Sequence, residues 1–166
     1  MPRVVLIGAP GSGKSSVGMA LAKSLTLHFV DTDLMVQTRT GKRISDVFMD
    51  QGEEAFREFE FEALVLALTE PLSVLSLGGG AAIPERAQRA LEESGAPIIF
   101  LDVSLSVAAP RVGFNRDRPL LLGNPRAQWQ ALYEVRRPIY EKLATVTIKV
   151  DTLQISEIVK AIEEAI

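Results

Sequence analysis

A glycine-rich segment near the N-terminus constrains the fold of this chain more than any other feature. Residues 8–15 read Gly-Ala-Pro-Gly-Ser-Gly-Lys-Ser and directly follow the apolar run 4–7. They fit the pattern G-x-x-x-x-G-K-[ST], in which a buried strand passes through a glycine-rich turn into a helix. Such a turn directs backbone N–H groups into one concavity, and the helix N-terminus adds roughly half a positive charge. This phosphate loop predicts a polyphosphate site; the alternative is a glycine-rich helix start that binds no ligand.

The side chains of the phosphate loop and the residue after it supply the rest of the predicted site. Lys14 would reach the terminal phosphates, and the Ser15 hydroxyl would ligate the Mg²⁺ that accompanies them. The Ser16 hydroxyl would bind a phosphate that lies deeper in the site than the terminal ones. The residues expected to bind the nucleotide here are Gly11, Ser12, Gly13, Lys14, Ser15 and Ser16.

Composition limits the class of protein. The 166 residues suit a single domain spanning 1–166, and an apolar content of 47% is typical of a globular chain with a sizeable core. The net charge of −3 disfavours nucleic acid or an anionic membrane as a partner. The absence of cysteine excludes disulfides and Cys-ligated metals and agrees with a cytoplasmic location. Glu70, Pro71 and three glycines interrupt the apolar stretch 64–83, so no membrane span is expected.

Short β-rich runs alternate with longer helical patterns along the chain. The predicted strands are 3–7, 28–31, 73–77, 97–103 and 146–150. The predicted helices are 15–25, 44–49, 53–68, 85–93, 104–111, 126–143 and 155–166. This alternation predicts an α/β protein whose five-stranded parallel sheet is covered by helices on both faces, with ligands at the carboxyl ends of the strands.

Two carboxylates follow the second predicted strand. Asp31 and Asp33 would lie at the same edge of the sheet as the phosphate loop, and residues two apart in an extended chain point the same way. An acid here can hold Mg²⁺ through a water or accept the proton of an attacking hydroxyl. We expect the first role for Asp31 and the second for Asp33. The alternative is that one or both cap the next helix.

Arg57 lies in an unusual place on its predicted helix. It shares a helical stripe with Phe61, Leu64 and Leu68, so a charged side chain begins an otherwise apolar face. A guanidinium beside the core is suited to bidentate binding of a carboxylate. The alternative is a surface ion pair with an acid three or four residues away, worth a few tenths of a kcal/mol.

Arg136 repeats this pattern on a later helix. It shares a face with Trp129, Tyr133 and Tyr140, whereas its neighbour Arg137 does not. Pro138 follows, and it is expected to kink or break the helix and so to aim Arg136 into a cleft. The alternative is an arginine whose stem packs on the core while its head reaches water.

Two glycine-rich segments complete the predicted site. Residues 78–80, the glycine loop, carry no Cβ atoms, so a small substrate could lie against the backbone at Gly79 and Gly80; a plain tight turn is the alternative. Residues 111–123 have little periodicity and contain three arginines in an acidic protein. We expect a lid at about 112–125 that closes over the nucleotide and adds positive charge; a solvated basic loop is the alternative.

The chain resembles the shikimate kinases over nearly its whole length. The motifs that carry the resemblance are G-x-x-x-x-G-K-S at 8–15, D-x-D at 31–33, G-E-x-x-F-R-x-x-E at 52–60, S-L-G-G-G at 76–80, R-P-L-L at 118–121 and R-x-P-[LI]-Y at 136–140. The phosphate loop is the least specific of them. The chain departs from the family in having Ser16 where Thr is common, and Leu153-Gln154 where a basic residue often lies near the nucleotide.

This resemblance implies phosphorylation of the 3-hydroxyl of shikimate by ATP, in a P-loop fold like that of nucleoside-monophosphate kinases. The implied substrate-binding residues are Asp33, Arg57, Gly79 and Arg136, of which the first two lie in a substrate-binding helical region at about 32–61. Arg118 would be the lid arginine at the phosphates and Arg111 would lie beside adenine, with Arg116 a second candidate for the lid. The catalytic groups would be Asp33, Lys14 and Arg118, with ATP and one Mg²⁺, in a cytoplasmic monomer of aromatic amino acid biosynthesis.

Two other functions remain open at this point. One is a kinase of the same architecture that acts on another small hydroxylated acid, such as gluconate. The other is a nucleotide-dependent binding module without catalysis, such as a GTPase-like switch. Its guanine-reading N-K-x-D motif is not matched, because Asn115-Arg116-Asp117-Arg118 has the acid one place too early.

Overall fold

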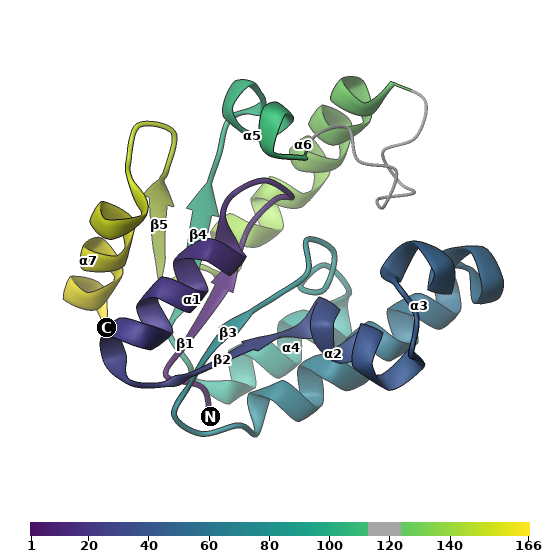
Figure 1. Ribbon diagram of the computed structural model, residues 1–166, viewed down its shortest axis with the longest axis horizontal. Coiled ribbons are helices and arrows are strands. Elements are labelled where there is room, and N and C mark those ends of the chain that lie inside the picture. The colour runs from purple at the N-terminus through teal and green to yellow at the C-terminus, as the bar shows by residue number, and fades with distance from the viewer. Residues whose placement is uncertain (113–123) are drawn as a thin grey trace.

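A five-stranded, fully parallel sheet forms the centre of the molecule (Figure 1). The computed structural model describes residues 1–112 and 124–166. The strands are β1 (Val4–Ile7), β2 (His28–Asp31), β3 (Ser73–Ser76), β4 (Ile98–Asp102) and β5 (Val146–Lys149). Their order is β2-β3-β1-β4-β5, so β1 and the phosphate loop that follows it lie in the middle of the sheet. The predicted parallel sheet is confirmed.

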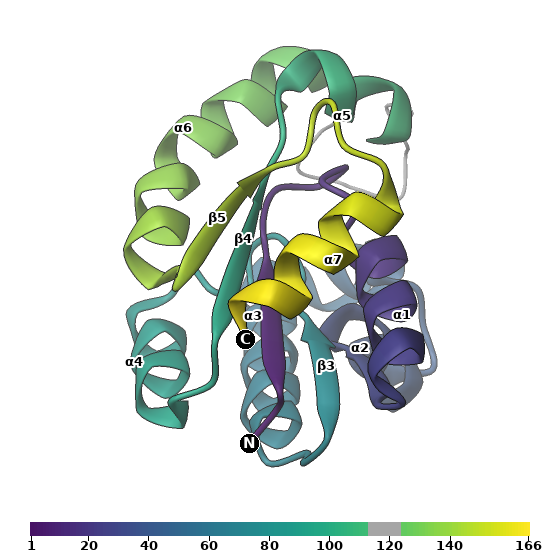
Figure 2. The ribbon, with the colours of Figure 1, turned by 90° about the vertical axis from the view of Figure 1, so that its left-hand side faces the viewer.

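Helices cover both faces of this sheet. They are α1 (Lys14–Leu25), α2 (Thr32–Thr40), α3 (Ile44–Leu68), α4 (Glu85–Ser94), α5 (Leu105–Val112), α6 (Pro125–Leu143) and α7 (Ile155–Ala165). Helices α1 and α7 pack together on one face, and α3, α4 and α6 lie on the other (Figures 1 and 2). This is the arrangement that right-handed crossovers between parallel strands produce. The three-layer α/β/α architecture is therefore as predicted. None of the described helices combines the length and apolar character that a bilayer span requires.

The described residues form two separate hydrophobic clusters. The larger one surrounds the sheet, where β1, β3 and β4 are buried along their whole lengths because helices cover both faces. The smaller one, the α2–α3 cluster, consists of Val36, Val47, Phe56 and Ala63. The unit formed by α2 and α3 thus has an apolar centre of its own beside the main core.

The structure differs from the local predictions at two places. The helix α2 was not predicted as an element, because Leu34, Met35 and Val36 form one short apolar run instead of a stripe with helical spacing. A kink or break at Pro138 was expected within the predicted helix 126–143; α6 does not break and continues through this proline to Leu143. A proline within a helix removes one backbone hydrogen bond. The buried face of α6 packs on the main core on both sides of Pro138, and this packing maintains the helix.

Candidate functional site

A pocket of about 460 Å³ lies at the carboxyl edge of the sheet. It brings together the phosphate loop, the two acids at the junction of β2 and α2, the end of β3 and two glycines of the glycine loop. Its lining residues are Pro10, Gly11, Ser12, Gly13, Lys14, Ser15, Ser16, Val17, Asp31, Asp33, Ser76, Leu77, Gly78, Gly79, Arg111, Leu153, Ile155 and Ile158. The six consecutive residues predicted to bind the nucleotide, 11–16, are all among them.

The phosphate loop needs glycine for both conformation and space. Gly11 and Gly13 have φ values of 83° and 89°, in the left-handed region where other residues are strained. A Cβ on Gly11 would also lie 2.9 Å from the carbonyl oxygen of Ala108. The Lys14 ammonium arches back over the loop and donates to the carbonyl oxygen of Gly8 at 2.8 Å. The positive charge of Lys14 is therefore held against the backbone of the phosphate loop.

Two neighbouring helices fix the position of the phosphate loop. The indole Nε1 of Trp129, from α6, donates to the Pro10 carbonyl oxygen at 2.9 Å. Arg111, from α5, donates from Nη1 to the carbonyl oxygen of Gly11 at 3.3 Å and lines the pocket beside the loop. Leu153 lines the same pocket, so an apolar side chain stands where the family often has a basic one.

Ser15 and Asp31 meet at a distance that suits a hard cation. The Ser15 hydroxyl donates to Asp31 Oδ2 at 3.2 Å, and the other carboxylate oxygen accepts from the N–H groups of Asp33 and Leu34. Asp31 is therefore the N-cap of α2 as well as a neighbour of Ser15, so both interpretations of this residue apply. Among the described residues no group of three or more His, Cys, Asp or Glu could hold a metal. A Mg²⁺ bound here would take its other ligands from phosphate and water, which is its usual mode of binding.

Asp33 faces the glycine loop from the first turn of α2. A Cβ on Gly78 would lie within 3.0 Å of Asp33 Oδ1. Both acids line the pocket, as predicted, but not because they extend from one strand. Asp31 ends β2 and Asp33 is already helical, so the turn of the helix brings the second carboxylate to the pocket.

Each glycine of the glycine loop faces one side chain of the predicted site. Gly78 faces Asp33, as described; a Cβ on Gly79 would lie 3.4 Å from Arg136 Nη1, and one on Gly80 within 3.0 Å of the Arg57 guanidinium. None of the three has a positive φ. Gly78 and Gly80 thus leave the space that Asp33 and Arg57 occupy, whereas a Cβ on Gly79 would come nearest to Pro10, at 3.2 Å.

A buried carboxylate pairs with Arg57 and lies within the electrostatic influence of Arg136. Arg57 donates from Nη1 to Glu60 Oε1 at 2.7 Å, and Glu60 is only 3% exposed. Burial raises the pKa of Glu60, the nearby Asp33 carboxylate adds to the rise, and the Arg57 and Arg136 guanidinium groups oppose it. The surface ion pair considered for Arg57 exists with Glu53, at 3.7 Å, but the pair with Glu60 is interior. The sequence offered Glu60, three residues after Arg57, only as a surface partner; its burial was not predicted.

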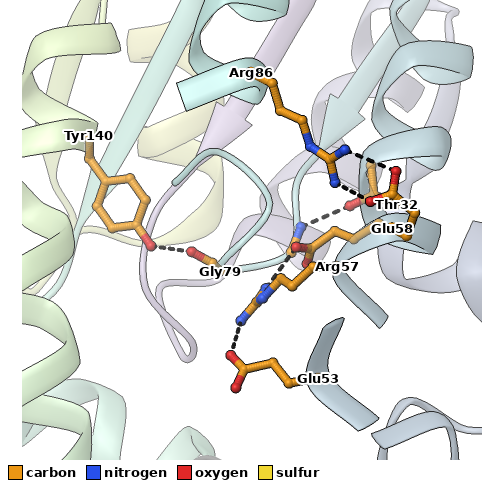
Figure 3. A network of polar contacts seen from close by, with 9 residues as sticks. Thr32, Glu53, Arg57, Glu58, Gly79, Arg86 and Tyr140 are labelled. Atoms are coloured by element: carbon orange, nitrogen blue, oxygen red, sulfur yellow. Dashed lines mark hydrogen bonds and ion pairs between the residues drawn. The ribbon is translucent and has the colours of Figure 1, made fainter. Parts of the chain in front are cut away.

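Two further residues missed as site residues hold the glycine loop in place (Figure 3). The Tyr140 hydroxyl donates to the carbonyl oxygen of Gly79 at 2.5 Å, and the N–H of Gly78 donates to Thr32 Oγ1 at 2.9 Å. Thr32 is fully buried. Thr32 of α2 and Tyr140 of α6 thus bind the loop from opposite sides. Arg136, one turn before Tyr140, is 8% exposed and does not extend into water.

Part of the predicted site lies outside the described residues. Arg116 and Arg118 fall between residues 112 and 124, as does most of the lid predicted at 112–125. Arg137 is placed as expected, away from the pocket, because it pairs with Asp102 at 2.8 Å and with Glu141 at 2.8 Å.

Comparisons with known proteins agree on one family. The family model described as shikimate kinase matches residues 10–166. The chain is 48% identical to the shikimate kinase of Thermobifida fusca over 147 residues, which is 89% of this chain and 84% of the relative. The solved shikimate kinase of Acinetobacter baumannii, in complex with shikimate, matches with a TM-score of 0.94 at 28% identity, over 99% of this chain and 92% of the other. The solved shikimate kinase of Aquifex aeolicus matches with a TM-score of 0.84 at 35% identity, over 99% and 95% of the two chains.

Proposed function

The chain belongs to the shikimate kinase family, and we propose that its pocket holds ATP on the phosphate loop and shikimate against the glycine loop, with Asp33 between them. The chain is a shikimate kinase, which transfers the terminal phosphoryl group of ATP to the 3-hydroxyl of shikimate on the route to chorismate. The alternatives of a gluconate kinase and of a non-catalytic nucleotide-binding module are not favoured.

On the nucleotide side, Lys14 and the backbone N–H groups of the phosphate loop bind the β- and γ-phosphates. Ser15 and Asp31 would hold one Mg²⁺, the first directly and the second through water; their side-chain oxygens meet beside the phosphate loop and are the hard ligands that this ion prefers. When bound, the ion neutralises the charge that develops on the transferring phosphoryl group. Arg118 adds a positive charge from the lid. Arg111 lies beside the adenine.

On the acceptor side, Arg57 and Arg136 bind the carboxylate of shikimate, and Asp33 orients and deprotonates the attacking hydroxyl. The observation that carries this proposal is the match between the three glycines and these three side chains, because each group approaches the bare backbone of a loop whose first two glycines line the nucleotide pocket together with Asp33. A small acid could lie on this surface with its carboxylate between the guanidinium groups. The hydroxyl would then face both Asp33 and the nucleotide.

The test is steady-state kinetics with shikimate and Mg-ATP, followed by coupled detection of ADP. Asp33→Asn should lower kcat about 10²- to 10⁴-fold, the usual contribution of a general base, and leave the KM for ATP within about twofold. Wild-type turnover by this variant at saturating shikimate would exclude Asp33 as the base.

The carboxylate clamp has a matched control on the same helix. Arg136→Lys should raise the KM for shikimate about 10- to 100-fold, since an ammonium cannot reproduce the bidentate contact. Arg137→Lys should leave that KM unchanged, because Arg137 pairs with Asp102 and Glu141 instead. Equal effects of the two substitutions would contradict the clamp. We further propose a cytoplasmic monomer without nucleic acid or membrane partners, and sedimentation velocity checks the oligomeric state.

A further inference from the structure

The glycine loop has a pattern of backbone hydrogen bonds that singles out one peptide group. Four N–H groups in and around the loop have acceptors: those of Leu77, Gly78, Ala81 and Ile83. In the described part of the chain, no hydrogen bond uses the N–H of Gly79 or of Gly80. The two residues that face Arg136 and Arg57 thus keep their N–H groups available for a ligand.

One side chain fixes the peptide between these two glycines. The Tyr140 hydroxyl donates to the Gly79 carbonyl oxygen at 2.5 Å. In a trans peptide the C=O and the following N–H are coplanar and point in opposite directions. Holding the Gly79 carbonyl toward α6 therefore turns the N–H of Gly80 away from α6. Without this hydrogen bond the peptide could rotate freely, because glycine restricts the backbone less than any other residue.

Tyr140 is well suited to hold this peptide. It is 1% exposed, and its ring centroid lies 5.2 Å from that of Phe100 on β4, so packing fixes the hydroxyl. Burial raises the pKa of Tyr140 to about 12, while the charge and hydrogen bond of Arg136 oppose the rise. The hydroxyl is thus protonated, and able to donate, at any pH at which the enzyme works. It contacts both Gly79 and Arg136, two residues proposed to bind the acid.

We propose that Tyr140 is a positioning residue for shikimate: by holding the Gly79 carbonyl it sets the Gly79–Gly80 peptide, and with it the wall against which the acid lies between Arg136 and Arg57. The proposal rests on the shikimate site described above and assigns Tyr140 no direct contact with substrate. Its effect is on the acceptor and not on the nucleotide, because Tyr140 does not line the nucleotide pocket.

Tyr133 is a matched control for the hydroxyl of Tyr140. It lies about two turns earlier on α6, is also buried, stacks on Trp129, and donates its hydroxyl to Asp102 instead of to the glycine loop. Tyr140→Phe and Tyr133→Phe each remove one buried hydroxyl from the same helix. A purely structural role for Tyr140 would make the two variants alike.

The experiment compares both variants with wild type by kinetics and thermal unfolding. Tyr140→Phe should raise the KM for shikimate about tenfold, the effect of losing one buried hydrogen bond, with the KM for ATP within about twofold. Tyr133→Phe should lower the melting temperature but leave both KM values unchanged. An unchanged KM for shikimate in Tyr140→Phe, or an equal rise in both variants, would overturn the proposal. If Arg136→Lys still raises that KM, then only the role of Tyr140 has failed and the shikimate site stands.

A measurement on the wild-type protein tests the premise that the acid lies against the Gly79–Gly80 peptide, even if Tyr140→Phe does not fold. With ¹⁵N-labelled glycine, addition of shikimate should shift the amide resonances of Gly79 and Gly80. Gly95, at the C-terminus of α4 with no side chain or backbone near its Cβ position, should not shift. Resonances of Gly79 and Gly80 that do not respond to saturating shikimate would overturn the proposal.

Discussion

Asp33, Arg57 and Arg136 each approach a position where a Cβ of the glycine loop would stand. At Gly78 and Gly80 the atoms that such a Cβ would displace are the far ends of flexible side chains. Moving either side chain takes its charged group out of place, and for Arg57 it also breaks the interior ion pair with Glu60. Gly78→Ala should therefore lower activity more than stability, whereas Gly80→Ala should lower both.

We predict a ranked series of alanine substitutions. Gly78→Ala displaces Asp33 and should lower kcat about 100-fold or more, by loss of the general base. Gly80→Ala displaces Arg57 and should raise the KM for shikimate at least about tenfold. Gly79→Ala should have the smallest effect, because its Cβ would lie 3.2 Å from Pro10 and 3.4 Å from Arg136. Kinetics and urea unfolding of all three variants test the order; similar activities at the three positions would refute it.

Glu60 should give the enzyme a pH-dependent stability of definite sign. Its pKa in the folded state is raised above 4.5, with burial as the largest cause. A carboxyl group of this kind binds its proton more tightly when folded, so its contribution is complete below the unfolded pKa and is lost as the pH rises through the folded pKa.

Glu60→Gln removes this titration. Relative to the variant, the wild type should lose free energy of unfolding as the pH rises from 4 through the folded pKa of Glu60, and the difference should then level off. Urea unfolding of both proteins between pH 4 and 8 measures it. A difference that is constant with pH would show that Glu60 does not titrate in this way.

At the junction of β2 and α2, one side chain, that of Asp31, both stabilises a helix and belongs to the proposed metal site. Asp31 caps α2 with one carboxylate oxygen and accepts from the Ser15 hydroxyl with the other. Because the two functions use different oxygens, they can be separated by substitution.

Asp31→Ala should lower the free energy of unfolding by about 1 kcal/mol, whereas Asp31→Asn should keep the cap and most of that stability. Both should raise the Mg²⁺ concentration needed for half-maximal activity, because both remove the charge. Asn124, which caps α6 by accepting from the N–H of Ala127, is the control. Asn124→Ala should lose stability without a change in the Mg²⁺ requirement. A normal Mg²⁺ requirement in Asp31→Asn would exclude a metal role for Asp31.

The elements that the sequence predicted well are those with a strong local pattern. The strands and the long helices were recognisable because buried parallel strands are continuous apolar runs and long helices show a periodic stripe. Helix α2 has no such stripe, and its clearest signal was its cap, Asp31, which was interpreted first as a metal neighbour. The burial of Glu60 and the hydroxyl of Tyr140 depend on which elements pack together. No local pattern records that, so their roles appeared only in three dimensions.

The whole molecule is divided by its two hydrophobic clusters. The main core spans the sheet and the helices on both faces, whereas the α2–α3 cluster contains four buried side chains. Gly52, with φ 85° and ψ 173°, interrupts α3, and the helical turns before it pack only on the smaller cluster. Asp33 lies on α2, so the proposed general base belongs to the less deeply anchored part of the protein, whereas Arg136 lies on α6, which packs on the main core.

Hydrogen exchange should therefore reveal a local opening of this part. Amides of α2 and of α3 before Gly52 should exchange with a lower opening free energy than those of β1 and β4, which should open only on global unfolding. Shikimate at about 100 times its Kd should raise the opening free energy of α2 by up to about 2.7 kcal/mol, because closing the site requires both Asp33 and Arg57 in place. Helices α1 and α7, which pack on the main core, are the internal reference. Equal opening free energies for α2 and β1 would mean that the two clusters unfold as one unit, and that the acceptor site is as rigid as the sheet that carries it.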